Sequence, residues 1–186
     1  MVDTIIFDFD GTIVDSKKAL VAGWNKLAQK TNYRELKLSD IEKFRKLSIK
    51  EKGQFLRCPL YKIPFLMPKF YRLYQEFIHE VEIIDGIKEL MENLKTKGYY
   101  IGILSTNSPE NISTVLERYQ ITSVSKIFSS TSVFGKDKLL KRLIMEERIP
   151  ISKVIYIGDE ERDIIACNKV NVPMIWVSWG DTTLKK

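Results

Sequence analysis

The sequence predicts an α/β fold, a doubly wound and mostly parallel sheet into which a block of helices is inserted. Short apolar runs rich in Ile, Val, Tyr and Phe recur along the chain and end at Asp, Ser, Thr or Gly, which is typical of buried parallel strands. Segments with apolar residues at helical spacing separate most of these runs. Alternating strands and helices indicate right-handed crossovers and a parallel sheet.

The expected elements follow one another in chain order. The strand candidates are Thr4 to Phe9, Tyr99 to Leu104, the weaker run Lys126 to Ser130, Val154 to Ile157 and Met174 to Val177. Helical stripes are formed by Ile87, Leu90, Met91 and Leu94, by Ile112, Val115, Leu116 and Tyr119, and by Leu139, Leu140, Leu143 and Ile144. Ser108 followed by Pro109 predicts a helix start, and Gly98 predicts a helix end.

Residues 16–82 interrupt the alternation, because they carry helical patterns and no convincing strand. Phe70, Tyr74 and Phe77 share one predicted helical face, and Pro59, Pro64 and Pro68 precede it. We therefore expect an α/β core made of residues 1–15 and 83–186 and an all-helical insertion at 16–82.

Size and composition exclude several classes of protein. With 186 residues, 44% of them hydrophobic, the chain has enough apolar material for one folded domain with a modest insertion. Its two cysteines, Cys58 and Cys167, make neither a disulfide scaffold nor a Cys-based metal site. No stretch approaches the roughly 18 apolar residues of a membrane span, so we expect a cytoplasmic protein.

The net charge of +6 is concentrated in one block of the chain. Residues 1–15 hold four acids and no Lys or Arg, residues 16–80 have a net charge of +9, and residues 81–186 have a net charge of +1. A basic insertion suggests an anionic partner. The alternative is that the lysines solvate the outer faces of helices.

Two clusters of acidic residues follow strand candidates. Asp8 and Asp10 are two residues apart, so both side chains lie on one side of an extended chain. Asp159 begins the second cluster. If the two strands are neighbours, these carboxylates converge at the carboxyl edge of the sheet and suit Mg²⁺.

Each acidic cluster also has a structural interpretation. Asp10-Gly11 is a common turn dipeptide. Glu160, Glu161 and Asp163 favour the positive start of the following helix, an interpretation we adopt for Glu161 and leave open for Glu160.

Two further loops carry groups that suit an anion. Ser105, Thr106 and Asn107 follow the second strand at a helix start, where hydroxyls and backbone N–H groups bind anions or simply cap the helix. Gly135 and Lys136 open a later helix, although most surface lysines are only solvated.

Four segments together resemble a known family. The segments are DFDGTIVDS at Asp8 to Ser16, STN at Ser105 to Asn107, GK at Gly135 and Lys136, and GDEERD at Gly158 to Asp163. In order and spacing they resemble the four motifs of the haloacid dehalogenase-like superfamily, and most closely its phosphoglycolate phosphatase-like branch. The resemblance implies that residues 16–82 are a helical cap. Asp85-Gly86 stands where this branch often has Pro-Gly.

The resemblance also implies a role for each matched residue. Asp8 is implied to be the nucleophile that forms an aspartyl-phosphate, and Asp10 the general acid and base. The implied ligands of Mg²⁺ are the Asp8 carboxylate, the Asp10 backbone carbonyl and Asp159, with Asp163 as support. The implied phosphoryl-binding groups are the Thr106 hydroxyl, the backbone N–H groups of Phe9, Asp10 and Asn107, and Lys136; Thr12 is implied to fix the loop.

Two of these assignments have alternatives. Ser105 could replace Thr106, although the family places its hydroxyl residue directly before Asn. Lys138 could replace Lys136, although Lys136 directly follows Gly135 at the loop.

The expected function is hydrolysis of a small phosphorylated metabolite by a Mg²⁺-dependent phosphatase. A phosphotransferase or phosphomutase would use the same residues. A nucleic-acid-binding protein that uses the basic insertion is an unlikely alternative, because crowded carboxylates without a cation are costly. We expect a structural role for His79, and Trp24 could face either the substrate or the cap interior. The sequence carries no prediction of the oligomeric state.

Overall fold

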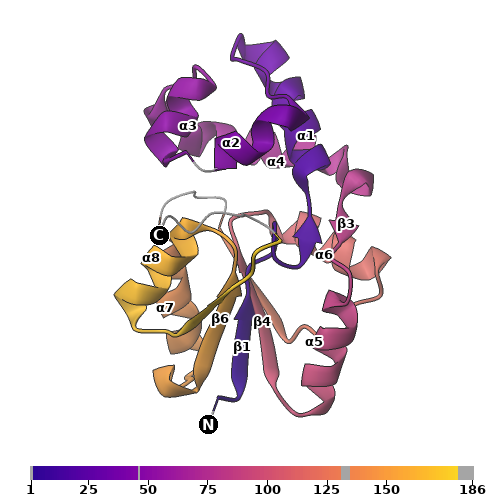
Figure 1. Ribbon diagram of the computed structural model, residues 1–186, viewed down its shortest axis with the longest axis vertical. Coiled ribbons are helices and arrows are strands. Elements are labelled where there is room, and N and C mark those ends of the chain that lie inside the picture. Colours follow the sequence, from indigo (N-terminus) through magenta and orange to yellow (C-terminus); the bar gives the residue numbers. More distant parts are fainter. Residues whose placement is uncertain (1, 46, 131–134, 180–186) are drawn as a thin grey trace.

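The computed structural model describes residues 2–45, 47–130 and 135–179. Its centre is a five-stranded parallel sheet with the strand order β5-β4-β1-β6-β7 (Figure 1). The strands are β1 (Thr4–Phe7), β4 (Tyr100–Ser105), β5 (Lys126–Ser129), β6 (Val154–Gly158) and β7 (Met174–Trp176). The predicted α/β class is confirmed, and the carboxyl ends of β4, β1 and β6 lie side by side.

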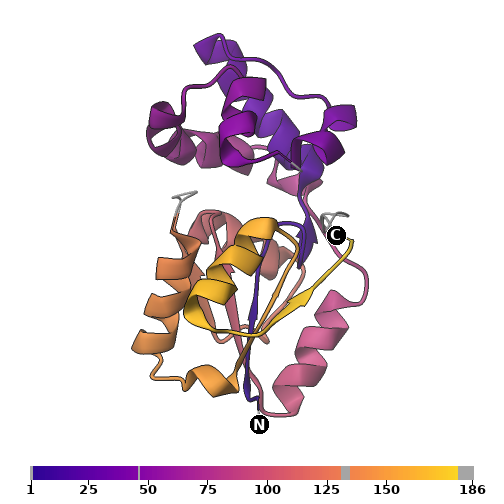
Figure 2. The same ribbon diagram turned by 60° about the vertical axis from the view of Figure 1, so that its left-hand side comes forward.

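Helices cover both faces of this sheet (Figure 2). α5 (Ile87–Thr96) and α6 (Pro109–Arg118) pack on the face that Ile5 and Phe7 enter. α7 (Lys136–Glu146) and α8 (Glu161–Val170) pack on the face that Ile6 enters, and the one-turn helix η4 (Ile151–Lys153) precedes β6. Because both faces are covered, β1 is a continuous apolar run rather than an alternating one.

The helix ends follow the predicted signals. The Ser108 hydroxyl accepts a hydrogen bond from the Asn111 N–H at 3.2 Å and so caps α6. Gly98 has a φ of 85°, the left-handed conformation in which helices commonly end. The predicted caps at these two positions are confirmed.

Strand β1 is shorter than the predicted run, because the chain turns immediately after it. The Ile13 and Val14 N–H groups both donate to the Phe9 carbonyl, at 2.9 and 3.1 Å. Gly11 has a φ of 87° inside this turn, which favours glycine. The turn holds Asp8 and Asp10 at the end of β1, where a straight strand would have carried Asp10 past the sheet.

Residues 16–80 form a helical layer above the carboxyl edge of the sheet (Figures 1 and 2). Its helices are α1 (Lys17–Thr31), α2 (Ile41–Arg45), α3 (Ile49–Phe55) and α4 (Ile63–Gln75), with the short helices η1 (Leu38–Asp40), η2 (Leu60–Lys62) and η3 (Ile78–Glu80). α1 packs against α4, and a small apolar cluster that includes Leu36, Ile41 and Leu56 fills the space beside them.

The sequence wrongly placed two prolines before the helix that carries the aromatic residues. α4 begins at Ile63 and therefore contains both Pro64 and Pro68. Pro64 lies in the first turn, where a backbone N–H has no helical partner, but Pro68 removes a hydrogen bond from the helix interior. Burial of the aromatic face of α4 outweighs that loss.

A second, two-stranded sheet joins the helical layer to the parallel sheet and was not predicted. β2 (Val14–Asp15) and β3 (Glu82–Ile83) are antiparallel, with Val14 opposite Ile83 and Asp15 opposite Glu82. Each strand has only two residues, too few to show alternation in a sequence. The chain therefore leaves and rejoins the core at adjacent points.

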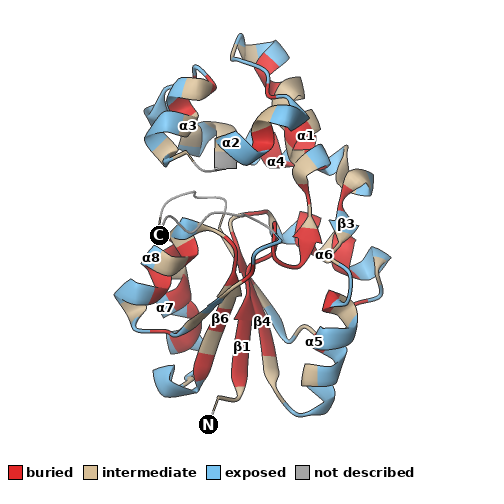
Figure 3. Cartoon of the chain, viewed as in Figure 1, coloured by how far each residue is buried: buried red, intermediate tan, exposed pale blue. Residues whose placement is uncertain are grey.

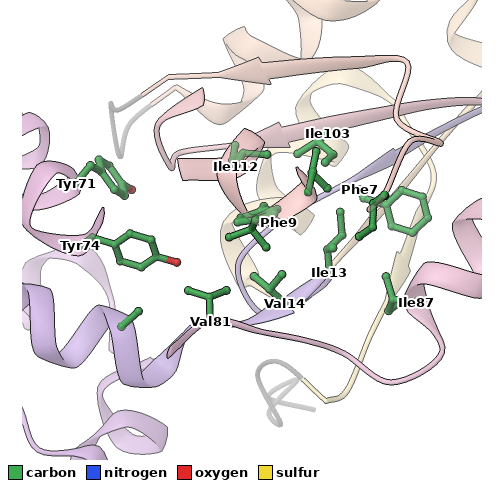
Figure 4. Close-up of a cluster of buried hydrophobic side chains, with 14 of the residues drawn as sticks. Phe7, Phe9, Ile13, Val14, Tyr71, Tyr74, Val81, Ile87, Ile103 and Ile112 are labelled. Atoms are coloured by element: carbon green, nitrogen blue, oxygen red, sulfur yellow. The ribbon is translucent and has the colours of Figure 1, made fainter. Parts of the chain in front are cut away.

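Buried residues lie both in the helical layer and in the core (Figure 3). Tyr71 and Tyr74 of α4 point toward Phe9 and Val81 (Figure 4), and all four belong to one buried cluster. Gly23 allows α1 to approach α4 closely, since a Cβ atom there would lie 2.9 Å from the Tyr74 Cα atom. In the part of the chain that the structure describes, no helix is long and apolar enough to cross a membrane.

Candidate active site

The four motif segments meet at the carboxyl edge of the sheet. Asp8 follows β1, Thr106 follows β4, Asp159 follows β6, and Lys136 is the first residue of α7. Since these strands are neighbours and parallel, residues far apart in sequence are brought to one place. This is the arrangement expected for a ligand site in an open α/β sheet.

A buried ion pair joins Asp8 to Lys136. The Lys136 Nζ atom lies 3.0 Å from Asp8 Oδ1 and also pairs with Asp163. Burial raises the pKa of Asp8, and the positive charge of Lys136 opposes that shift. Burial alone would lower the pKa of Lys136, but the carboxylates of Asp163 and Asp8 outweigh it and raise that pKa. Lys136 is therefore a permanent cation beside the Asp8 carboxylate.

Three buried carboxylates could hold a metal ion. Asp8, Asp159 and Asp163 place carboxylate oxygens within 4.8 Å of one another. The single ammonium of Lys136 leaves these three carboxylates with an excess of negative charge, which a divalent cation would offset. Oxygen ligands of this kind suit a hard cation. The residues present therefore fit a divalent cation, although the carboxylate that joins those of Asp8 and Asp159 is that of Asp163 and not that of Asp10.

Neighbouring groups hold two of these carboxylates in position. The Thr12 hydroxyl donates to Asp159 Oδ1 at 3.1 Å. Asp163 accepts from the Glu160 N–H at 3.1 Å and from the Tyr156 hydroxyl at 3.3 Å. Gly158 leaves room for Asp163, because a Cβ atom there would lie 2.5 Å from Asp163 Oδ2. The residue types at these positions thus keep the acidic cluster compact.

Asp10 lies on the same edge but is held by a different neighbour. The Asn107 side-chain amide donates to Asp10 Oδ2 at 3.0 Å. The side-chain oxygen of Asn107, Oδ1, in turn accepts from the Ser108 N–H and from the Asn111 side chain, at 2.8 and 3.0 Å. Asn107 is completely buried, so this chain of hydrogen bonds sets the direction of the Asp10 carboxylate.

The structure distinguishes Ser105 from Thr106. Ser105 is buried, and its hydroxyl accepts from the Asn107 N–H at 3.0 Å, so it shapes the loop. Thr106 lines a cavity between the sheet edge and the helical layer, and its hydroxyl accepts from the Tyr71 hydroxyl at 3.5 Å. The geometry favours Thr106 as the group that faces a ligand. The Asn107 N–H, expected at the phosphoryl group, instead donates to Ser105.

Lys136 and Lys138 differ in the same way. Lys136 is 7% exposed and lies in the carboxylate cluster, whereas the Lys138 side chain is exposed. The geometry therefore favours Lys136.

Phe9 is completely buried, with its ring in the apolar cluster that also holds Tyr71 and Tyr74 (Figure 4), so only its backbone can face the site.

The remaining candidates lie outside the carboxylate cluster. Glu160 caps α8 and pairs with Arg162, which outweighs the effect of burial and lowers the Glu160 pKa. Glu161 is exposed in the first turn of α8, as expected. His79 is exposed beside Glu80, with 3.7 Å between Nε2 and Oε1.

Trp24 faces the inside of the helical layer. Its ring stacks on Tyr33 at 6.2 Å between centroids, and its indole N–H donates to the Arg34 carbonyl at 2.9 Å. Its side chain also lines the cavity that reaches Thr106. The two alternatives for Trp24 are therefore not exclusive.

Sequence reasoning missed Tyr71 and Asn111. Tyr71 is 6% exposed, and burial raises the pKa of its phenol, so the hydroxyl remains a hydrogen-bond donor. The Asn111 side chain joins the two layers, because it donates both to the Tyr71 backbone carbonyl, at 3.2 Å, and to Asn107. The helical spacing of Tyr71 and Tyr74 was a usable signal for Tyr71, but nothing in the sequence indicated the role of Asn111.

Comparison with known proteins agrees with this geometry. Residues 5–177 match the haloacid dehalogenase-like hydrolase family. A phosphoglycolate phosphatase from Synechococcus elongatus is 30% identical over 177 residues, which cover 95% of this chain and 84% of that protein.

Solved structures show the same fold. A haloacid dehalogenase-like hydrolase from Streptococcus pneumoniae superposes with a TM-score of 0.79 at 18% identity, covering 96% of this chain and 86% of that one. CbbY from Rhodobacter sphaeroides, in complex with phosphate, superposes with a TM-score of 0.75 at 14% identity, covering 99% and 90%. The four converging segments, the family match and these relatives lead to one conclusion: the chain belongs to the haloacid dehalogenase-like hydrolase family, as a phosphatase of the phosphoglycolate phosphatase-like kind.

Proposed function

We propose that the chain is a Mg²⁺-dependent phosphatase that hydrolyses a small phosphorylated metabolite through an aspartyl-phosphate on Asp8. The observation that carries this proposal is the buried Asp8–Lys136 ion pair at the end of β1, with Asp10 and Thr106 on the same edge. A carboxylate restrained in this way is a suitable nucleophile for phosphorus.

Phosphatases of this family use a divalent metal ion. Asp8 and Asp159 would hold it together with the Asp10 backbone carbonyl, and Asp163 would support them. When bound, the ion offsets the negative charge of the carboxylates and of the phosphoryl oxygens.

Asp8 and Asp10 divide the covalent chemistry between them. A carboxylate oxygen of Asp8 attacks phosphorus, and the bond from phosphorus to the ester oxygen breaks. Asp10 donates its proton to the departing oxygen, and the alcohol leaves. The Asp10 carboxylate then takes a proton from water, whose oxygen attacks phosphorus. The bond to Asp8 breaks, and inorganic phosphate is released.

The other residues position the reacting groups and stabilise the charge that develops during the reaction. The Lys136 ammonium restrains Asp8 and offsets the charge that develops on the phosphoryl group. The Thr106 hydroxyl and the Phe9 N–H hold phosphoryl oxygens. Asn107 aims Asp10, and Thr12 orients Asp159.

Residues 16–82 act as a cap over this edge, and residues 1–15 and 83–186 form the catalytic core. The shared burial of Tyr71, Tyr74 and Phe9 supports this division, because it places the helical layer directly above the catalytic loops. A layer in that position excludes water from the aspartyl-phosphate until the alcohol has left.

The test is hydrolysis of p-nitrophenyl phosphate with and without Mg²⁺, for the wild type and for Asp8→Asn. We expect Asp8→Asn to lose at least about a thousandfold in kcat. Asp3→Asn is the matched control, because Asp3 is partly exposed and pairs with Lys153 away from the site. Equal activity in Asp8→Asn would refute the nucleophile. A sugar phosphate returned as an isomer, with little inorganic phosphate, would instead identify a phosphomutase.

A further inference from the structure

The helical layer contains a cavity that opens onto the catalytic edge. Its volume is about 250 Å³, and Asp10 and Thr106 line its catalytic end. Glu160 and Arg162 at the start of α8 also line it, and its other walls come mainly from α1, α2, α3 and α4. We call its apolar part, bounded by Leu20, Trp24, Phe44, Ile49, Leu66 and Met67, the apolar chamber. A group bonded to a phosphoryl oxygen at Thr106 would extend into this chamber.

The cations that line the cavity already have partners. Lys17 lies 3.5 Å from Asp15, and Arg162 pairs with Glu160. The Lys52 ammonium lies 5.7 Å from the centre of the Phe44 ring, and it too is engaged. Among the described lining residues, the apolar chamber therefore offers no unengaged cation for a second anionic group.

A carboxylate inside such a chamber would lose its hydration without gaining a counter-ion, which is costly. An apolar group would gain from the same walls, because each buried methylene strengthens binding by roughly fourfold. A dry cavity of roughly 150 Å³ lined by Leu, Ile and Phe is large enough to bind benzene. The whole cavity has a volume of about 250 Å³, so it has room for a single ring or a short alkyl chain.

We propose that the substrate is a phosphate monoester whose organic group is apolar, of about the size of one ring or a six-carbon chain. This inference rests on the proposed phosphatase activity and specifies its substrate class. It differs from the substrate in the name of the Synechococcus relative, because the glycolate group of phosphoglycolate is small and carries a carboxylate.

Three alkyl esters test the substrate class, namely ethyl phosphate, hexyl phosphate and 6-phosphonooxyhexanoate. All three release primary alcohols of similar reactivity, so differences in kcat/KM report recognition. We expect kcat/KM for hexyl phosphate to exceed both of the others by at least about tenfold. A preference for the carboxylate-bearing ester, or for phosphoglycolate, would overturn the inference.

A pair of neighbouring substitutions tests the location. Leu66→Gln places an amide in the apolar chamber, whereas Phe65 is 81% exposed, so Phe65→Gln is the matched control. We expect Leu66→Gln to lower kcat/KM for hexyl phosphate by about tenfold more than it lowers kcat/KM for ethyl phosphate. Equal losses for both esters would show that Leu66 does not contact the organic group.

A binding measurement separates this inference from the proposed activity and does not require a variant to fold. Hexylphosphonate and ethylphosphonate cannot be hydrolysed, and calorimetry on the Mg²⁺-loaded wild type compares their affinities. Tighter binding of hexylphosphonate by at least about tenfold supports the apolar chamber even if turnover is absent. Hydrolysis of p-nitrophenyl phosphate without any preference for hexyl over ethyl groups would refute the inference and leave the phosphatase intact.

Discussion

Tyr71 links the helical layer, through a single hydroxyl, to the loop that we propose binds the phosphoryl group. Its O–H donates to Thr106 at 3.5 Å, while its ring packs against Phe70 and Tyr74. We expect Tyr71→Phe to reduce kcat/KM for p-nitrophenyl phosphate by about three- to tenfold, because one long hydrogen bond to a neutral group is worth about 1 kcal/mol. The melting temperature should change little, since the ring remains.

Steady-state kinetics and thermal unfolding of Tyr71→Phe check this prediction. Tyr61→Phe is the control, because Tyr61 lies in the same layer and is 73% exposed. Unchanged kinetics in Tyr71→Phe would show that the hydroxyl has no part in positioning Thr106.

Lys136 offsets buried negative charge, so its removal should make stability depend on pH. In Lys136→Met, the pKa of Asp8 rises further above its ordinary value, because burial is no longer opposed by the ammonium. The folded protein then holds protons that the unfolded chain releases above pH about 4. Stability therefore falls as the pH rises, with a loss of up to about 3–5 kcal/mol near neutral pH.

Urea unfolding in EDTA at pH 5 and pH 8 measures this dependence. Lys138→Met, at an exposed position, should follow the wild type at both pH values. A deficit for Lys136→Met that is the same at pH 5 and pH 8 would contradict the assignment.

Among single residues, the sequence predicted those that follow strands. It did not predict those that join the helical layer to the core. Asp8, Asp10 and Asp159 were identifiable because each stands just after an apolar run, and strand order then brings them together. Asn111 was not identifiable, because its role depends on α4 lying against α6. No local pattern encodes that packing.

Among the elements, the contact between α1 and α4 depends on Gly23. An alanine Cβ atom there would lie 2.9 Å from the Tyr74 Cα atom, too close without separating the helices. Alanine favours a helix over glycine by about 1 kcal/mol, but the backbone contact should dominate. We expect Gly23→Ala to destabilise the protein by about 1–3 kcal/mol in urea unfolding. A gain in stability would show that the two helices separate at little cost.

Elements with a regular apolar pattern were predicted well, and the two-residue strands and the start of α4 were not. α5, α6 and α7 each repeat their apolar residues over several turns, so their periodicity is visible. β2 and β3 have two residues each, and the length of α4 was hidden by Pro64 and Pro68. Helix propensity places prolines outside helices, but burial of the aromatic face of α4 keeps Pro64 and Pro68 within this helix.

For the whole molecule, the crowded carboxylates predict that a divalent cation stabilises the fold. Asp8, Asp159 and Asp163 repel one another in the metal-free protein. Mg²⁺ at about 100 times its dissociation constant should add about 2.7 kcal/mol. This corresponds to a rise of roughly 5–10 °C in melting temperature for a chain of this size.

Thermal unfolding in EDTA and in rising Mg²⁺ measures the shift. Asp159→Asn should abolish it, whereas Asp137→Asn should retain it, since Asp137 lies 3.6 Å from Lys169 and outside the cluster. A melting temperature that is independent of Mg²⁺ in the wild type would contradict the metal site.

The sequence could not predict the interior of the helical layer. Its net charge of +9 over residues 16–80 suggested an anionic partner. The structure shows that the cavity within this layer is mainly apolar and that Lys17 and Arg162 of its lining pair with Asp15 and Glu160. The net charge can be counted from the sequence. The lining of a cavity depends instead on which faces of α1, α2, α3 and α4 turn inward.

Because β2 pairs with β3, the chain enters and leaves the helical layer at two points that are neighbours in space. With Asp15 opposite Glu82, the two ends are spaced like the arms of a β-hairpin, which a two-residue turn such as Asn-Gly is able to close. An insertion at this point can therefore change in length without altering the strand order of the parallel sheet. In the function that we propose, the residues that select the substrate thus belong to one excursion of the chain, and the motif residues belong to the parallel-sheet core.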